Sequence, residues 1–148
     1  MSARDCGGRV AAGWSLPGDL RSIATARAHV REALSGHVPP AVLADAVLAA
    51  SELATNAVRY TASGSKPDGR YALAVAVLAG SAGRRVRVAV VDQGSADVPR
   101  VASAAAMDDA DALGGRGLGC LACLGSVGWE DVPPGRRVWA DLPIGGAR

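Results

Sequence analysis

The chain has little of what direct binding of nucleic acid requires. Aromatic residues make up 3% of its 148 residues, and the formal net charge is only +2. Nucleic-acid binders usually combine a strongly basic surface with aromatic platforms for the bases. The arginines near residues 84–87 and 136–137 border strand-like segments, where we expect a solvated face. We therefore expect no direct contact with nucleic acid.

Cysteines are few, and no long apolar run is present. The three cysteines are an odd number, so they offer no disulfide framework. Cys120 and Cys123 form a C-x-x-C without a second pair or nearby histidines, whereas a zinc site needs about four ligands. The N-terminus has no continuous apolar segment typical of a secretory signal, and the run from Tyr71 to Gly80 is too short to span a bilayer. We expect a protein of the reducing cytoplasm with no membrane contact.

Length and element order predict one α+β domain over residues 1–148. Residues 1–13 are expected to form an arm or a first strand, with a strand at 9–14. Further expected elements are helices at 19–34, 40–60 and 116–124, strands at 71–78, 84–91, 126–130 and 137–142, and loops at 62–70 and 97–115. Helices and strands that come in blocks favour a two-layer α/β sandwich. We expect one mixed or antiparallel sheet with helices on a single face.

The second predicted helix carries a polar stripe on an otherwise apolar surface. Most positions from Val42 to Val58 are apolar or small, as in a buried helix. Glu52 and Asn56 lie four residues apart and so share one face, which Arg59 extends. Asn56 is the only asparagine in the chain. Burial of an unpartnered amide costs roughly 2–7 kcal/mol, so the stripe faces either water or a ligand.

Two further segments have the composition of a nucleotide pocket. Asp92-Gln93-Gly94 directly follows an alternating strand, which places a carboxylate acceptor at a strand end beside a glycine that leaves room for a flat ligand. A simple turn would have the same sequence. Residues 114–119 contain four glycines and Arg116 before an apolar helical run. Such a segment presents backbone amides and a helix N-terminus to phosphate, although a flexible hinge has the same composition.

The usual lysine-based phosphate sites are absent from the sequence. There is no G-x-x-x-x-G-K-[ST] motif, and the only lysine, Lys66, lies in a loop of Gly, Ser and Pro. Phosphate would therefore have to be held by Mg²⁺, arginine and backbone amides.

Three segments in this order resemble the conserved boxes of the GHKL ATPases. Residues 51–60 (SELATNAVRY) resemble the N box, residues 90–94 (VVDQG) the G1 box and residues 115–119 (GRGLG) the G2 box. Within that superfamily the chain is most similar to anti-sigma factor serine kinases and related actinobacterial ATP-binding regulators. Residues 26–30 (ARAHV) and 138–143 (VWADLP) also resemble theirs. The resemblance covers nearly the whole chain after about Trp14 and implies the Bergerat fold.

The resemblance also implies roles for single residues. Asn56 would ligate Mg²⁺, Glu52 would be the general base, and Asp92 and Gly94 would hold the adenine of ATP. The remaining implied contacts are with the phosphates, from Gly115, Arg116, Gly117, Leu118 and Gly119. In the serine kinases the base accepts the proton of a serine hydroxyl on a small anti-anti-sigma partner. Phosphoryl transfer needs mainly positioning, a metal ion and one oriented proton acceptor, which these residues could supply.

The chain departs from the family pattern at some positions, and two functions remain open. Tyr60 stands where relatives commonly have histidine, and the segment before Gly114 is short and acidic. His29 and His37 lie in no phospho-acceptor context, which disfavours a histidine autokinase. One hypothesis is a serine kinase that also sequesters a sigma factor, and the other is an ATP-dependent regulator that binds a partner without phosphorylating it. A homodimer is compatible with both hypotheses.

Overall fold

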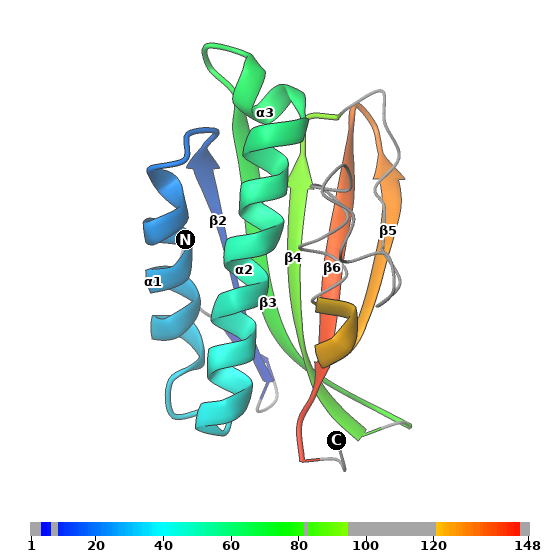
Figure 1. The fold of residues 1–148 in the computed structure, drawn as a ribbon. Coiled ribbons are helices and arrows are strands. Elements are labelled where there is room, and N and C mark those ends of the chain that lie inside the picture. Colours follow the sequence, from blue (N-terminus) through cyan, green and yellow to red (C-terminus); the bar gives the residue numbers. More distant parts are fainter. Residues whose placement is uncertain (1–3, 7–8, 82, 95–120, 146–148) are drawn as a thin grey trace.

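The computed structural model describes residues 4–6, 9–81, 83–94 and 121–145, which form one sheet with helices on one face (Figure 1). In chain order the elements are β1 (Arg4–Cys6), β2 (Arg9–Pro17), α1 (Ser22–Leu34), α2 (Pro40–Tyr60), α3 (Ala62–Ser65), β3 (Arg70–Gly80), β4 (Gly83–Asp92), β5 (Ser126–Val132) and β6 (Gly135–Pro143). The strands lie in the order β1-β2-β3-β4-β6-β5, and all neighbours are antiparallel. The expected α+β sandwich is confirmed, and its sheet is antiparallel.

The first helix begins three residues later than the sequence predicts. Asp19 accepts the backbone N–H of Arg21 at 2.8 Å through its Oδ1, and this local bond holds residues 19–21 in a turn. Helix α1 therefore starts at Ser22, whose hydroxyl lies 2.7 Å from the buried Tyr71 hydroxyl on β3. Gly36 follows the helix with φ +81°, a conformation that favours glycine. The prediction of where α1 ends is thus confirmed.

Helix α2 has the bounds that the sequence predicts, because Pro40 occupies the first turn and the apolar pattern continues to Tyr60. Within the described part of the chain, α2 is the one helix long and apolar enough to cross a bilayer by length and composition alone. Its buried residues belong to the core, together with those of β3 and β4. The hydropathy of α2 is that of a core helix in this fold.

The segment predicted as a loop at residues 62–70 contains a short helix. Residues 62–65 form α3, which packs against the C-terminal part of α2. The expected strands are present, each with one or more extra residues at its ends. Of the helix predicted at 116–124, residues 121–124 are helical. The loop at 97–115 and residues 116–120 lie outside the described residues.

The two faces of the sheet differ in what covers them. Val86, Val88 and Val90 of β4 are buried toward the helices. Leu73 and Val75 of β3 are buried on the same side of the sheet. Helix α1 contacts β2 and β3, whereas α2 contacts β3, β4 and β6. Figure 1 shows both helices on this inner face, with α2 over the middle of the sheet. Among the described elements, no helix covers the opposite face, which we call the outer face.

Candidate functional site

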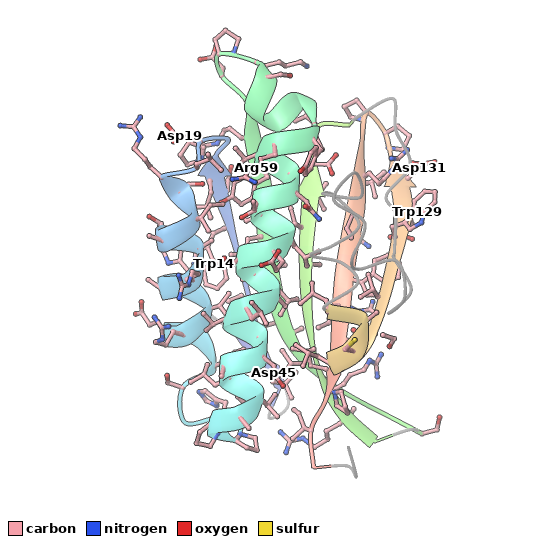
Figure 2. The ribbon with its side chains drawn as sticks, viewed as in Figure 1. Trp14, Asp19, Asp45, Arg59, Trp129 and Asp131 are labelled. Atoms are coloured by element: carbon pink, nitrogen blue, oxygen red, sulfur yellow. The ribbon has the colours of Figure 1, made fainter. Side chains whose placement is uncertain are left out.

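The polar stripe of α2 lies on one flank of the helix. Glu52 and Asn56 are half-buried, as is Asp45, which lies seven residues before Glu52 and therefore on the same flank. Asp45 was not predicted as a site residue, although its spacing of seven residues from Glu52 indicates the same helical face. Arg59, which was expected to extend the stripe, is exposed near the C-terminal end of α2 (Figure 2). Two carboxylates and an amide thus follow one side of an otherwise apolar helix.

The opposite flank of α2 faces α1. A groove of about 450 Å³ runs between the two helices, lined from α2 by Leu43, Val47 and Ser51 and from α1 by Arg27 and Arg31. None of the stripe residues lines this groove. The stripe therefore points away from α1, toward the half of the sheet formed by β4 and β6, which α2 also contacts.

Asp92 ends β4 on the inner face of the sheet. Its side chain lies on the same side of the sheet as those of Val86, Val88 and Val90, and only 8% of the residue is exposed. The C-terminal ends of β4 and α2 lie at the same end of the molecule (Figure 1). Asp92 and Asn56 were predicted to share a pocket, and the fold brings them to the same end and the same face of the sheet.

Burial raises the pKa of the Asp92 carboxyl above its ordinary value. Three interactions oppose this shift in pKa. The backbone N–H of Gly94 donates to Oδ1 at 2.7 Å, the positive charge of Arg136 favours the ionised carboxylate, and the Arg136 backbone also hydrogen-bonds to it. A buried carboxylate held by a backbone amide is a fixed hydrogen-bond acceptor. It suits an exocyclic amine, which carries two donors.

The fold itself needs a glycine at position 94, in addition to the room that a ligand would need there. Its φ is +97°, and a Cβ atom built on it would stand 2.6 Å from the carbonyl oxygen of Pro134 in the β5–β6 turn. A side chain at this position would therefore strain the backbone and displace the turn. This contact is a reason for the glycine that the sequence did not show.

Arg136 is a charged neighbour of Asp92 that sequence reasoning placed on a solvated face. The two residues are directly opposite across β4 and β6, and the Arg136 side chain is only 14% exposed. Its guanidinium donates to Asp131 at 3.0 Å and stacks over the Trp129 ring at 5.0 Å. Figure 2 shows Trp129 and Asp131 together on β5. The expectation of a solvated face is therefore wrong for Arg136, because it lies on the inward side of β6.

The glycine-rich segment is not part of the described structure. Gly115, Arg116, Gly117, Leu118 and Gly119, together with Cys120, lie outside the described residues. The helical residues 121–124 follow that segment directly, and Leu121 is fully buried in the core. The phosphate contacts predicted for this segment stay predictions.

The chain matches a model of the histidine kinase-like ATPase domain over residues 16–126. This match spans α1, the polar stripe of α2, Asp92 and the glycine-rich segment. The chain belongs to the histidine kinase-like ATPase domain family. Membership confirms the resemblance stated from the sequence motifs, and it implies that ATP is the nucleotide this domain binds.

Comparison with solved structures supports the same fold. The chain is similar to the crystal structure of the RsbU and RsbW domains of Rv1364c from Mycobacterium tuberculosis, with a TM-score of 0.58 and 20% sequence identity. The alignment covers 90% of this chain and 32% of that one, so this domain spans about a third of the larger protein. A search of curated proteins finds no significant match. Likeness at this identity concerns the fold of the ATPase domain and does not extend to its substrates.

Proposed function

We propose that this ATPase domain is a cytoplasmic Mg-ATP-dependent regulator that binds a sigma factor and phosphorylates a serine on an anti-anti-sigma partner. The observation that carries the ATP site is the shared location of Asp92 and the stripe of α2. A buried carboxylate acceptor and an Asn-Glu pair come from separate elements to one end of the inner face. Such convergence of polar groups beside an apolar core is typical of ligand sites.

The stripe has the oxygen donors that Mg²⁺ prefers. Protein sites for this ion commonly supply one or two oxygen ligands, and the phosphates of the nucleotide and water supply the others. Asn56 offers a half-buried amide oxygen, and among the described residues no group of three or more His, Cys, Asp or Glu side chains is placed to hold a metal ion by itself. This donor set fits a metal held largely by the nucleotide. When bound, Mg²⁺ would neutralise charge on the phosphates.

Asn56 and Glu52 then have separate tasks. Asn56 would orient the metal–phosphate group, and Glu52, one turn before it, would accept the proton of an incoming serine hydroxyl. Asp92 would accept from the adenine amine. The glycines and Arg116 would surround the phosphates. The partner serine would therefore have to approach along the flank of α2 that faces away from α1.

Asp92→Asn tests the proposal that Asp92 binds the adenine of ATP. The substitution replaces an acceptor with a group that also donates, so ATP affinity should fall at least about tenfold, roughly 1.4 kcal/mol. GTP, which has a carbonyl where adenine has an amine, should bind poorly to the wild type. Calorimetry with both nucleotides measures this, with the exposed Asp68→Asn as the matched control. Tight GTP binding by the wild type would rule out this role for Asp92.

The same variant distinguishes a binding role from a structural one. The folded-state pKa of Asp92 is raised by burial, so this carboxyl opposes folding once the pH exceeds its folded pKa and ceases to do so below its ordinary value of 3.8. Asn removes the charge and keeps an oxygen for the Gly94 N–H. The nucleotide-free variant should therefore melt at a higher temperature than wild type at neutral pH, and the difference should shrink as the solution is acidified. A lower melting temperature at neutral pH would contradict this account.

Arg136→Gln tests whether the charge beside Asp92 keeps it ionised. Without that charge the pKa of Asp92 should rise further, so ATP binding should be lost at a higher pH on the acidic side of its profile. ATP affinity measured from about pH 4 to 8 gives the profile. Arg137→Gln is the matched control, because Arg137 lies on the outer face and pairs with Glu130 at 2.6 Å. Identical profiles for the two variants would assign Arg136 no part in the site.

The second candidate is a non-catalytic regulator that binds its partner only when ATP is bound. Both candidates predict that Mg-ATP binds, and they differ in whether phosphate leaves the nucleotide. Glu52 favours the kinase, since a domain that only binds has no need of a carboxylate at that position. Co-purification of a small anti-anti-sigma-like protein, followed by mass spectrometry for phosphoserine, would decide between them. A bound partner that never gains phosphate would leave the regulator in place of the kinase.

A further inference from the structure

The groove between α1 and α2 has one apolar wall and one basic wall. The α2 wall is made of apolar or small side chains, namely Pro40, Leu43, Ala44, Val47, Leu48 and Ser51. The α1 wall is made of Arg27 and Arg31. These two arginines are four residues apart, so their side chains leave the same face of α1 one turn apart. The groove therefore combines apolar surface with two positive charges at helical spacing.

The positive charge of the α1 wall is not neutralised by the protein itself. Both groove arginines are exposed, and in the part of the chain that the structure describes neither forms an ion pair. Glu32 and Asp45 each follow a lining residue in sequence, but neither of them lines the groove. Arg87 on β4, by contrast, is paired with Asp141 at 2.8 Å. A ligand in the groove would thus meet two guanidinium groups that have no carboxylate of their own.

Part of the apolar wall remains in contact with water. Leu48 is 42% exposed and Leu43 is half-buried, whereas Val47 between them is 6% exposed and belongs to the core. Covering apolar surface stabilises a complex by roughly 25 cal/mol per Å². A partner that brings apolar side chains to this wall would therefore gain free energy that water does not supply.

The shape of the groove follows from the two helices that form it. Helices α1 and α2 pack against each other and lie side by side over the sheet (Figure 1), so the groove between them is concave and runs along both. Its volume of about 450 Å³ holds a few side chains and not a whole domain. A flat lipid surface would reach the exposed guanidinium groups but not the floor between the helices. A third helix laid along the groove would reach both.

We infer that this groove binds an amphipathic helix of a partner protein, one that carries carboxylates beside its apolar stripe. The apolar side chains of that helix would cover Leu43 and Leu48. Two of its carboxylates, four residues apart, would pair with Arg27 and Arg31, because side chains at this spacing lie on one face of a helix. Docking of an amphipathic helix in an apolar groove is a common mode of recognition, and a guanidinium group matches the geometry of a carboxylate.

A helix in this groove leaves the nucleotide site open. Ser51 lines the groove, whereas Glu52 and Asn56 belong to the opposite flank of α2 and Asp92 lies at the end of β4. The partner helix and ATP would therefore occupy different sides of α2. The inference goes beyond the proposed function, because such a helix can dock whether or not phosphate is transferred.

A synthetic peptide of about 18 residues, long enough to form a helix by itself, tests the inference. Three forms share one leucine stripe and carry glutamate, glutamine or lysine at two positions four residues apart beside it. Fluorescence anisotropy with the whole chain should give a dissociation constant below about 100 µM for the glutamate form. The other two forms should bind at least about tenfold more weakly. Binding of the glutamate form should weaken as salt is added, because exposed charges are screened.

Reversing both charges of the α1 wall, with Arg27→Glu and Arg31→Glu in one variant, tests the basic wall. The glutamate peptide should bind this variant about tenfold more weakly or worse, because like charges now face each other. The lysine peptide should bind it more tightly than it binds wild type. Arg84→Glu is the matched control, since Arg84 on β4 is also exposed, lies outside the groove and forms no ion pair among the described residues. It should bind all three peptides as wild type does.

Leu48→Ala tests the apolar wall without a change of charge. Alanine is well tolerated at an exposed helical position, so the variant should fold. Its affinity for the glutamate peptide should fall about fivefold, because part of the apolar contact is removed. Leu20→Ala is the matched control, since Leu20 is 51% exposed and lies outside the groove.

Circular dichroism and ATP affinity report whether each variant is folded. Weaker binding of the glutamate peptide in both groove variants, with both controls at the wild-type value, supports the inference. A wild type that binds none of the peptides, or binds the glutamate and lysine forms equally, overturns it. Binding to phosphatidylserine vesicles that needs Arg27 and Arg31, without peptide binding, overturns it in favour of a lipid surface. A chain that binds the glutamate peptide through the groove but does not bind ATP would overturn only the proposed function.

Discussion

Replacing Asn56 with alanine should reduce the affinity for Mg-ATP by about 100-fold or more, roughly 2.7 kcal/mol, because it removes the side-chain oxygen assigned to the metal. The side chain is the chain's only asparagine amide, and it is half-buried on the flank of α2 that faces β4 and β6. The loss should appear only with Mg²⁺ present, since the amide acts on the nucleotide through the metal. Calorimetry with ATP, with and without Mg²⁺, separates the two contributions.

Thr55→Ala is the matched control for this prediction. Thr55 is also half-buried on α2, but its hydroxyl donates to the Ser51 carbonyl at 2.6 Å and is therefore already bonded within the helix. It should bind Mg-ATP as wild type does. Equal affinity in wild type and Asn56→Ala would remove Asn56 from the site. A loss of similar size without Mg²⁺ would mean that Asn56 acts on the nucleotide directly.

Most of the fold could be predicted from local sequence. Pro40 and an apolar pattern over residues 42–58 define α2, and the alternation of Val86, Val88 and Val90 defines β4 and its buried side. The start of α1 could not, because the side chain of Asp19 bonds locally to Arg21 and delays the helix. A helix boundary of this kind depends on a single hydrogen bond, which the spacing of apolar residues does not reveal.

The candidate site was predictable only where its residues lie close in sequence. Glu52 and Asn56 share a helical face by spacing alone. Arg136 and Asp92 are neighbours because β6 lies between β4 and β5, and nothing in the local pattern of residues 135–143 shows that order. For the same reason the sequence shows that β3 alternates, but not that its alanine side lacks a covering helix.

The strongest separation between the two proposed functions comes from Glu52→Gln. The amide keeps the shape of the carboxylate and an oxygen that accepts hydrogen bonds, but it removes the basicity. If Glu52 accepts the proton of the serine hydroxyl, phosphate transfer should fall by roughly 10²–10⁴, the usual contribution of a positioned general base. ATP binding should stay within about threefold of wild type, because the nucleotide is assigned to Asn56, Asp92 and the glycines.

The measurement is transfer from labelled ATP to a co-purified partner, with nucleotide and partner binding followed in parallel. Glu32→Gln, at an exposed position of α1, is the matched control and should transfer phosphate at the wild-type rate. The Glu52→Gln variant should still bind its partner, since the carboxylate is needed for proton transfer and not for partner binding. A wild type that binds its partner but never transfers phosphate would reject the kinase and favour the regulator. Wild-type transfer by Glu52→Gln would leave the ATP site as described and place the base on another residue, with Asp45 on the same flank as the next carboxylate to replace.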